Sequence, residues 1–129
     1  MINYGFTKEL ERPFAATVEA VTEALKEEGF GILTKVDVKE KFKEKLGVDF
    51  RNYVILGACN PPSAFKAIEA EENIGLMLPC NVIVYEKAGK TSVGIIKPTV
   101  AMGMIDNNAL KPLALEVEAK LKRVIDSLV

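Results

Sequence analysis

The only two cysteines of the chain lie in two similar segments, in which each cysteine is followed by an asparagine. The segments are Cys59-Asn60 and Cys80-Asn81, and proline lies beside the pair in both. A thiol can attack an electrophile or form a disulfide, and the amide next to it can hydrogen-bond to a sulfur or to a ligand. Both segments stand where a run of β-type residues meets a turn signal. We therefore expect them to meet in space and to form one site.

The function that this pattern favours is the binding of a small molecule, without demanding chemistry. The predicted site has four polar members: Cys59, Asn60, Cys80 and Asn81. Its apolar wall is predicted to consist of Phe65, Tyr85 and Met102. The sequence names neither the ligand nor a cofactor.

A thiol-dependent enzyme or redox sensor is the first alternative. Cys59 precedes a predicted helix that starts near Ser63, and the N–H groups at a helix N-terminus lower the pKa of a nearby thiol. Cys59 would then be the attacking thiolate and Cys80 its resolving partner. The ordinary interpretation is a small buried apolar residue at the end of a strand, which is how free cysteine usually behaves. The second alternative is a dimeric protein-interaction module that uses an exposed sheet edge.

The absence of histidine excludes several classes of chemistry. Ser-His-Asp and Cys-His catalysis and histidine-based zinc sites all need this residue within the chain. Two cysteines are too few for a closed zinc site, so we predict no metal site. The 17 basic and 18 acidic residues give a net charge of -1, from which no attraction to nucleic acid or to a membrane follows.

No signal peptide and no apolar segment of membrane-spanning length are visible in the sequence. We therefore expect a cytoplasmic protein, in which cysteines are normally reduced.

Hydrophobic periodicity predicts five strands and four helices in one domain over residues 1–129. The strands are expected near 2–6, 30–36, 53–59, 76–85 and 92–97, and a hairpin turn joins the last two. The helices are expected from Pro13 to Gly29, from Asp37 to Gly47, over 63–72, and from Asn107 or Asn108 to the end. Strands grouped beside helices in this order favour an α+β fold, with helices packed on one face of a mostly antiparallel sheet.

Some packing details also follow from the pattern. The apolar run 53–59 predicts a central strand buried on both faces. Phe65 and Ile68 are expected to face inward from their helix, and Val38, Phe42 and Leu46 to form the apolar edge of the short one. The segment 102–107 is expected to be either an adaptable lid or a buried approach to the final helix.

The motifs as a set resemble the DUF302 family, also called TT1751-like. The resemblance rests on the run from Leu56 through Cys59 to Pro61, on Ala64, on the run from Leu78 through Cys80 to Val82, and on Tyr85-Glu86. It covers essentially the whole chain. It implies a compact α+β domain with a sheet arranged like that of the TATA-binding protein, and it implies a homodimer. The family is one of unknown function, so it implies no catalytic role for either cysteine.

Overall fold

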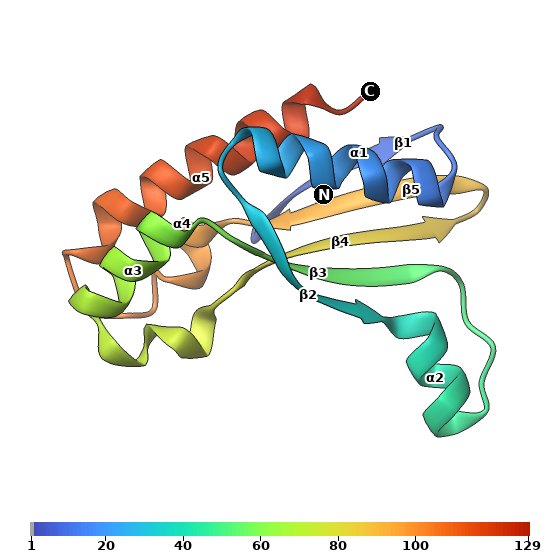
Figure 1. The fold of residues 1–129 in the computed structure, drawn as a ribbon, viewed down its shortest axis with the longest axis horizontal. Helices are drawn as coiled ribbons and strands as arrows, with labels where there is room; N and C mark the ends of the chain where they lie inside the picture. The colour runs from blue at the N-terminus through green and yellow to red at the C-terminus, as the bar shows by residue number, and fades with distance from the viewer. Residues whose placement is uncertain (1) are drawn as a thin grey trace.

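Five strands form one antiparallel sheet, with the spatial order β1-β5-β4-β3-β2 (Figure 1). The computed structural model describes residues 2–129. The strands are β1 (Gly5–Leu10), β2 (Gly31–Asp37), β3 (Tyr53–Cys59), β4 (Cys80–Lys87) and β5 (Lys90–Ile96). The helices are α1 (Phe14–Glu27), α2 (Val38–Leu46), α3 (Pro61–Ala70), the short 3-10 helix η1 (Glu72–Met77), α4 (Pro98–Ala101) and α5 (Leu110–Ser127). The predicted α+β class and antiparallel sheet are confirmed.

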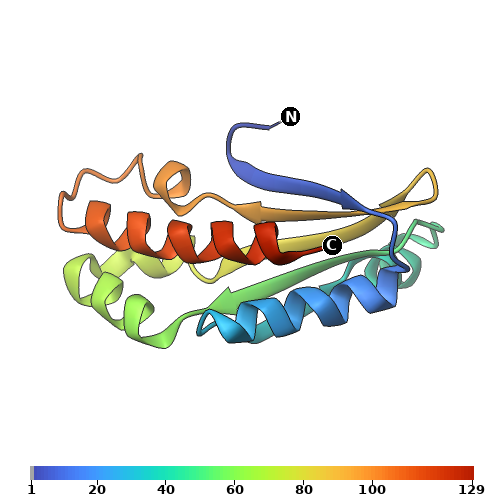
Figure 2. The same ribbon diagram turned by 90° about the horizontal axis from the view of Figure 1, so that it is seen from above.

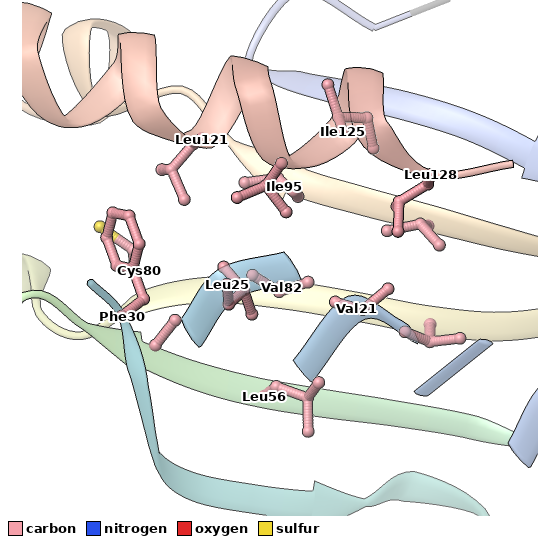
Figure 3. Close-up of a cluster of buried hydrophobic side chains, with 14 of the residues drawn as sticks. Val21, Leu25, Phe30, Leu56, Cys80, Val82, Ile95, Leu121, Ile125 and Leu128 are labelled. Carbon is pink, nitrogen blue, oxygen red and sulfur yellow. The ribbon is translucent and has the colours of Figure 1, made fainter. Parts of the chain in front are cut away.

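The two longest helices, α1 and α5, lie side by side over one face of the sheet (Figures 1 and 2). An ion pair joins them, because the Arg123 guanidinium donates to the Glu28 carboxylate at 3.0 Å. The main core lies between these helices and the sheet, and Figure 3 shows part of it. It contains one apolar stripe of the final helix, from Val117 through Leu121 and Val124 to Leu128.

The local capping signals act as the sequence predicts. The Asp37 side chain accepts a hydrogen bond from the Glu40 backbone N–H at 3.0 Å and begins α2. Gly47 ends that helix with a φ of 66°, in the left-handed region that favours glycine. Ala88 and Gly89, both with positive φ, form the hairpin turn between β4 and β5.

Two predictions about helix faces are wrong. Phe65 and Ile68 do not face inward from α3, since they are 64% and 46% exposed. The small residues Ser63 and Ala67 are the buried ones, because they allow the helix to approach its neighbours closely. Leu46 of α2 is also exposed, so the apolar edge of that helix is limited to Val38 and Phe42, which are half-buried.

Two predictions about strands also need correction. The first strand begins at Gly5, so Ile2 and Tyr4 precede it. Strand β3 is an interior strand, between β4 and β2, but its large side chains are buried on one face only: Val54, Leu56 and Ala58 are buried, whereas Tyr53 and Ile55 on the opposite face are half-exposed. The reason is topological, because α1 and α5 both cover the same face. Two-sided burial belongs to sheets that have helices on both sides.

The two edge strands differ in regularity. The pairing of β2 with β3 shifts register between Ile32 and Thr34, which leaves Leu33 as an extra residue in a bulge. The other edge strand, β1, pairs with β5 without interruption from Gly5 to Leu10. Its residue Lys8 lies opposite Val93, on the covered face, and its ammonium group donates to the carbonyl oxygens of Ile125 and Leu128 at the end of α5.

Candidate functional site

Within residues 2–129, no long helix lies over the second face of the sheet, and Figure 1 shows α2 and η1 projecting on that side, at opposite ends. We call it the uncovered face. Residues that pair directly across antiparallel strands point to the same side, so the register defines two rows of side chains. The first row runs from β3 to β1 through Tyr53, Tyr85, Ser92 and Glu9. The second runs through Ile55, Ile83, Gly94 and Thr7.

Both rows change from large to small side chains between β4 and β5. Beyond Tyr85 and Ile83, the residues Ser92, Gly94 and Thr7 rise little above the backbone, and the long side chain of Glu9 follows only at the edge of the sheet. The absence of a side chain at Gly94 matters, because a Cβ there would lie 2.9 Å from Cγ1 of Ile83. We call the surface formed by Ser92, Gly94 and Thr7 the floor. The side chains of Tyr85 and Ile83 on β4 stand beside it, and we call them the wall.

The result is a hollow of about 710 Å³ on the uncovered face. Its lining includes the floor and wall residues together with Ile2 and Tyr4, which precede β1. The carbonyl oxygen of Tyr4 accepts a hydrogen bond from the Lys97 backbone N–H at 2.9 Å, so this segment is held beside the end of β5. The hollow is thus bounded on more than one side.

Aromatic rings continue from the hollow toward α2. The rings of Tyr53 and Tyr85 are stacked, with centroids 5.2 Å apart and an interplanar angle of 12°. Phe50 is tilted against Tyr53 at 6.4 Å, and Phe42 of α2 meets Phe50 edge to face at 5.0 Å. Such contacts stabilise by about 0.5–1.5 kcal/mol each beyond the area they bury. These contacts hold the rings of Tyr53 and Tyr85 in place, and the two rings form one side of the hollow.

The polar groups of the hollow are of several kinds. Tyr85, Ser92 and Thr7 supply hydroxyl groups, and Asn81 supplies an amide. Arg51 and Lys87 supply positive charge at the end near α2. The Glu9 carboxylate also lines the hollow, but the Lys90 ammonium lies 3.4 Å from it.

The two Cys-Asn segments are brought to neighbouring strands. Cys80 lies opposite Ala58, the residue before Cys59. Since alternate residues of a strand point to opposite faces, Cys80 belongs to the covered face with Ala58, and Cys59 belongs to the other. Both thiols are free.

A small cavity lies between β3, α3 and α5 where these segments meet. Its volume is about 30 Å³, and its lining includes Cys59, Asn60, Cys80 and Met102. A cavity needs about 10–15 Å³ of such volume to hold one water, so this one has room for water but not for an organic ligand.

Burial controls the chemistry of Cys80. Burial, with a smaller contribution from the neighbouring Cys59, raises the pKa of this thiol to about 11. Cys80 and Phe30 both line the small cavity, at one end of the core drawn in Figure 3. At neutral pH this thiol is protonated, and it is therefore a weak nucleophile.

Asn60 has a structural role in the same region. Its side-chain oxygen accepts from the Ser63 backbone N–H at 3.3 Å, which caps α3, and its amide nitrogen lies 3.5 Å from the Glu28 carbonyl oxygen. Asn60 thereby joins the start of α3 to the end of α1.

The structure thus divides the predicted site between three places. Cys59, Asn60, Cys80 and Met102 line the small cavity, and Asn81 and Tyr85 line the hollow of the uncovered face. Phe65 lines neither of them and is exposed on α3.

Sequence reasoning missed most of the hollow: Thr7, Arg51, Tyr53, Lys87, Ser92 and Gly94. One signal was available, because Tyr53 and Tyr85 each alternate with aliphatic residues that proved to be core. A tyrosine at the half-exposed positions of two strands is typical of a sheet face that meets water.

In the segment 102–107, Met102 and Ile105 are half-buried, as expected for a buried approach to the final helix, whereas Met104 is 75% exposed. Met102 and Ile105 pack against a second small cluster that contains Ala67, Ile74 and Leu110. Asn107 donates to the Ala70 carbonyl oxygen at 2.8 Å and to the Glu71 carboxylate at 3.0 Å. A further hollow of about 280 Å³ lies between this segment and α5.

Within residues 2–129, no helix combines the length and the hydrophobicity needed to cross a membrane.

Comparison with known proteins agrees with the fold. A search of curated proteins finds no match. The crystal structure of an uncharacterized conserved protein DUF302 from Bacillus stearothermophilus is 38% identical, with a TM-score of 0.88 over 95% of this chain and 96% of that one. Residues 6–128 match the model for the domain of unknown function DUF302. The chain therefore belongs to the DUF302 family.

Proposed function

We propose that this domain binds a small molecule in the hollow of the uncovered sheet face. The observation that carries the proposal is the hollow of about 710 Å³, since sites for organic ligands commonly measure about 300–1,000 Å³. An apolar wall with a few polar groups is also typical of such sites. Tyr85 and Ile83 supply the wall, and Ser92, Thr7 and Asn81 supply groups that can orient a ligand.

The proposal keeps the ligand class predicted from the sequence but moves the ligand away from the cysteines. The cavity at Cys59 and Cys80 measures only about 30 Å³, and Asn60 is engaged in capping α3. Asn81 and Tyr85 are the residues common to the sequence-based site and the hollow.

A thiol reaction is the second candidate. It is supported by the shared cavity of Cys59 and Cys80 on neighbouring strands, and opposed by the raised pKa of Cys80. Treatment with a mild oxidant followed by mass spectrometry tests it. Rapid formation of an intramolecular disulfide in the folded protein would support this candidate, and two thiols that stay free would exclude it.

The homodimer and the cytoplasmic location remain predictions from the sequence. The two free cysteines support a reducing compartment, and sedimentation of the isolated chain tests the oligomeric state.

Tyrosine fluorescence gives a direct test of the ligand proposal. The chain has three tyrosines and no tryptophan, and all three, Tyr4, Tyr53 and Tyr85, line the hollow. A ligand bound there should change the tyrosine emission, so a library of small organic molecules can be screened by this signal. Two-dimensional NMR of the ¹⁵N-labelled protein then locates each compound that binds.

A variant that fills the floor provides the decisive comparison. Thr7 is exposed on β1, so Thr7→Phe should fold and should weaken binding at least tenfold by occupying the ligand's space. Ala119→Phe adds the same ring at an exposed position of α5 and should leave binding unchanged. Compounds that shift the amides of α1 or α5, and bind equally well to Thr7→Phe, would refute the proposal.

A further inference from the structure

We propose that the ligand of the hollow is a flat molecule with an anionic group, held by Arg51 and Lys87 beside the stacked tyrosines. The inference rests on the proposed function and adds the class of ligand to it. It follows from the charges at one end of the hollow and from the shape of the wall.

The two cations lie at the same end of the uncovered face. Tyr53 lies opposite Tyr85. Lys87 stands two residues further along β4, on the same side as Tyr85, and Arg51 lies two residues before the start of β3. Both residues line the hollow. Two like charges that line the same hollow repel each other, so their placement favours an anion between them.

Neither cation is neutralised within the described part of the chain. The ion pairs of residues 2–129 use Lys41, Lys43, Lys90, Lys120, Lys122 and Arg123, but not Arg51 or Lys87. A bound anion would supply the missing partner.

The nearby acids are engaged elsewhere. Glu9 is paired with Lys90, and Asp49 with Lys43 at 3.1 Å. Glu86 accepts a hydrogen bond from the Asn52 amide, and its place after Tyr85 puts it on the other face of β4. The end of the hollow near α2 therefore has an excess of positive charge.

The guanidinium of Arg51 is also held in place. It lies over the ring of Phe50, 4.5 Å from the centroid. Stacking on an aromatic face leaves the N–H groups at the guanidinium edge available, and this planar fork matches a carboxylate or phosphate. Arg51 is thus oriented before a ligand arrives, which lowers the entropy cost of binding.

The wall favours a flat molecule. One face of the Tyr85 ring is stacked on Tyr53, and on its other side the row continues with the small residue Ser92. A planar group can lie in this space against Tyr85 and above the low floor of Ser92, Gly94 and Thr7.

Three probes with one ring system test the charge requirement: 2-naphthoate, 2-naphthamide and protonated 2-naphthylmethylamine. We expect all binding to shift the amides of Thr7, Ser92 and Gly94 in NMR titrations. We expect the anion to bind about tenfold more tightly than the neutral amide, a difference of about 1.4 kcal/mol in binding free energy. The cation should bind most weakly, because Arg51 and Lys87 repel it. Added salt should reduce the advantage of the anion.

Two double variants separate the local effect of Arg51 and Lys87 on binding from the effect of the net charge of the protein. The double variant Arg51→Gln/Lys87→Gln should lower the affinity for 2-naphthoate to that for 2-naphthamide. The control Lys26→Gln/Lys66→Gln removes the same charge from exposed positions of α1 and α3 and should bind as the original chain does. Circular dichroism melts confirm that each variant is folded.

The outcomes distinguish this inference from the proposed function. Equal affinity for 2-naphthoate and 2-naphthamide at the hollow would overturn the anion requirement and leave the binding site standing. If none of the three probes shifts the amides of the floor, both proposals are overturned. A dimer that Thr7→Phe dissociates would assign the face to a second copy of the chain, and would also overturn both.

Discussion

The two faces of the sheet are built from the same strands but have opposite character. On the covered face, Val54, Leu56, Val82, Val84 and Ile95 are at most 2% exposed. On the uncovered face, the alternate positions of those strands hold tyrosine, serine, asparagine and glycine beside isoleucine. The comparison teaches that one face determines the stability of the fold, and that the other is free to vary in shape and charge.

Each face also contains residues that depend on one particular neighbour. The covered face accepts the charged Lys8 because its ammonium group reaches the last carbonyl groups of α5. The uncovered face contains Gly57 and Gly94, where side chains of adjacent strands pass over the backbone. These exceptions provide the sharpest tests of the comparison.

The largest effect is expected from removing a core side chain of the covered face. Leu121 of α5 is fully buried, so Leu121→Ala should lower the free energy of unfolding by about 3 kcal/mol. Ile83→Ala on the uncovered face should cost about 1 kcal/mol, because Ile83 is only half-buried. Urea unfolding followed by circular dichroism measures both values. Equal losses would show that the two faces contribute equally to the free energy of unfolding.

The buried thiol should make stability depend on pH in the alkaline range. Folding raises the pKa of Cys80 from 9.0 to about 11, so the folded state retains a proton that the unfolded state releases. The resulting stability is fully present below pH 9 and is lost as pH rises through 11. It amounts to about 3 kcal/mol, at about 1.4 kcal/mol per pKa unit.

The matched variants for this prediction are Cys80→Ala and Cys59→Ala. Unfolding free energies measured from pH 8 to 11 should fall less steeply for Cys80→Ala than for the original chain. Cys59→Ala should retain most of the steep fall, because burial is the main cause of the shift. A slope unchanged by Cys80→Ala would contradict the assignment.

A side chain at Gly57 should disturb the uncovered face. Its Cβ would lie 2.1 Å from the Thr34 hydroxyl oxygen and 2.7 Å from Cγ of Pro79. Gly57→Ala should therefore destabilise by about 2 kcal/mol through overpacking. Gly31→Ala, where a Cβ meets nothing within 4 Å, is the control and should be nearly neutral in the same thermal unfolding experiment.

The smallest expected effect concerns the lysine of the covered face. Lys8→Met retains the aliphatic stem but removes the donor to the Ile125 and Leu128 carbonyl oxygens, so it should cost about 1 kcal/mol. Lys87→Met removes a lysine from the uncovered face and should change stability by less than about 0.5 kcal/mol. Hydrogen exchange of the last turn of α5 should accelerate in Lys8→Met and not in Lys87→Met.

Much of the fold could be predicted because local signals determine it. The aspartate at 37, the glycine at 47 and the turn at 88–89 each fix one backbone feature through their own chemistry. The apolar stripe of α5 has the period of a helix with one buried side. Such features do not depend on distant residues.

The candidate site could not be predicted in the same way, because it depends on which face the helices cover. An apolar run such as 53–59 is compatible with burial on one face or on both. The exposure of Phe65 has the same origin, since the small residues of α3 face the core. The hollow itself requires the pairing of Ser92 and Gly94 with residues of β1 and β4, and sequence spacing does not give this register.

The bulge at Leu33 has a consequence for how molecules of this protein meet one another. An edge strand offers unpaired backbone groups to which a strand of a neighbouring molecule can add, and an extra residue interrupts that row of groups. The exposed Lys35 follows the bulge on the same edge, and charge there further opposes stacking of sheets. At the opposite edge Lys8 and Glu9 lie within β1. Both edges of the sheet thus carry features that oppose edge-to-edge association of molecules. The uncovered face can therefore expose apolar side chains to solvent without an adjacent edge that promotes aggregation.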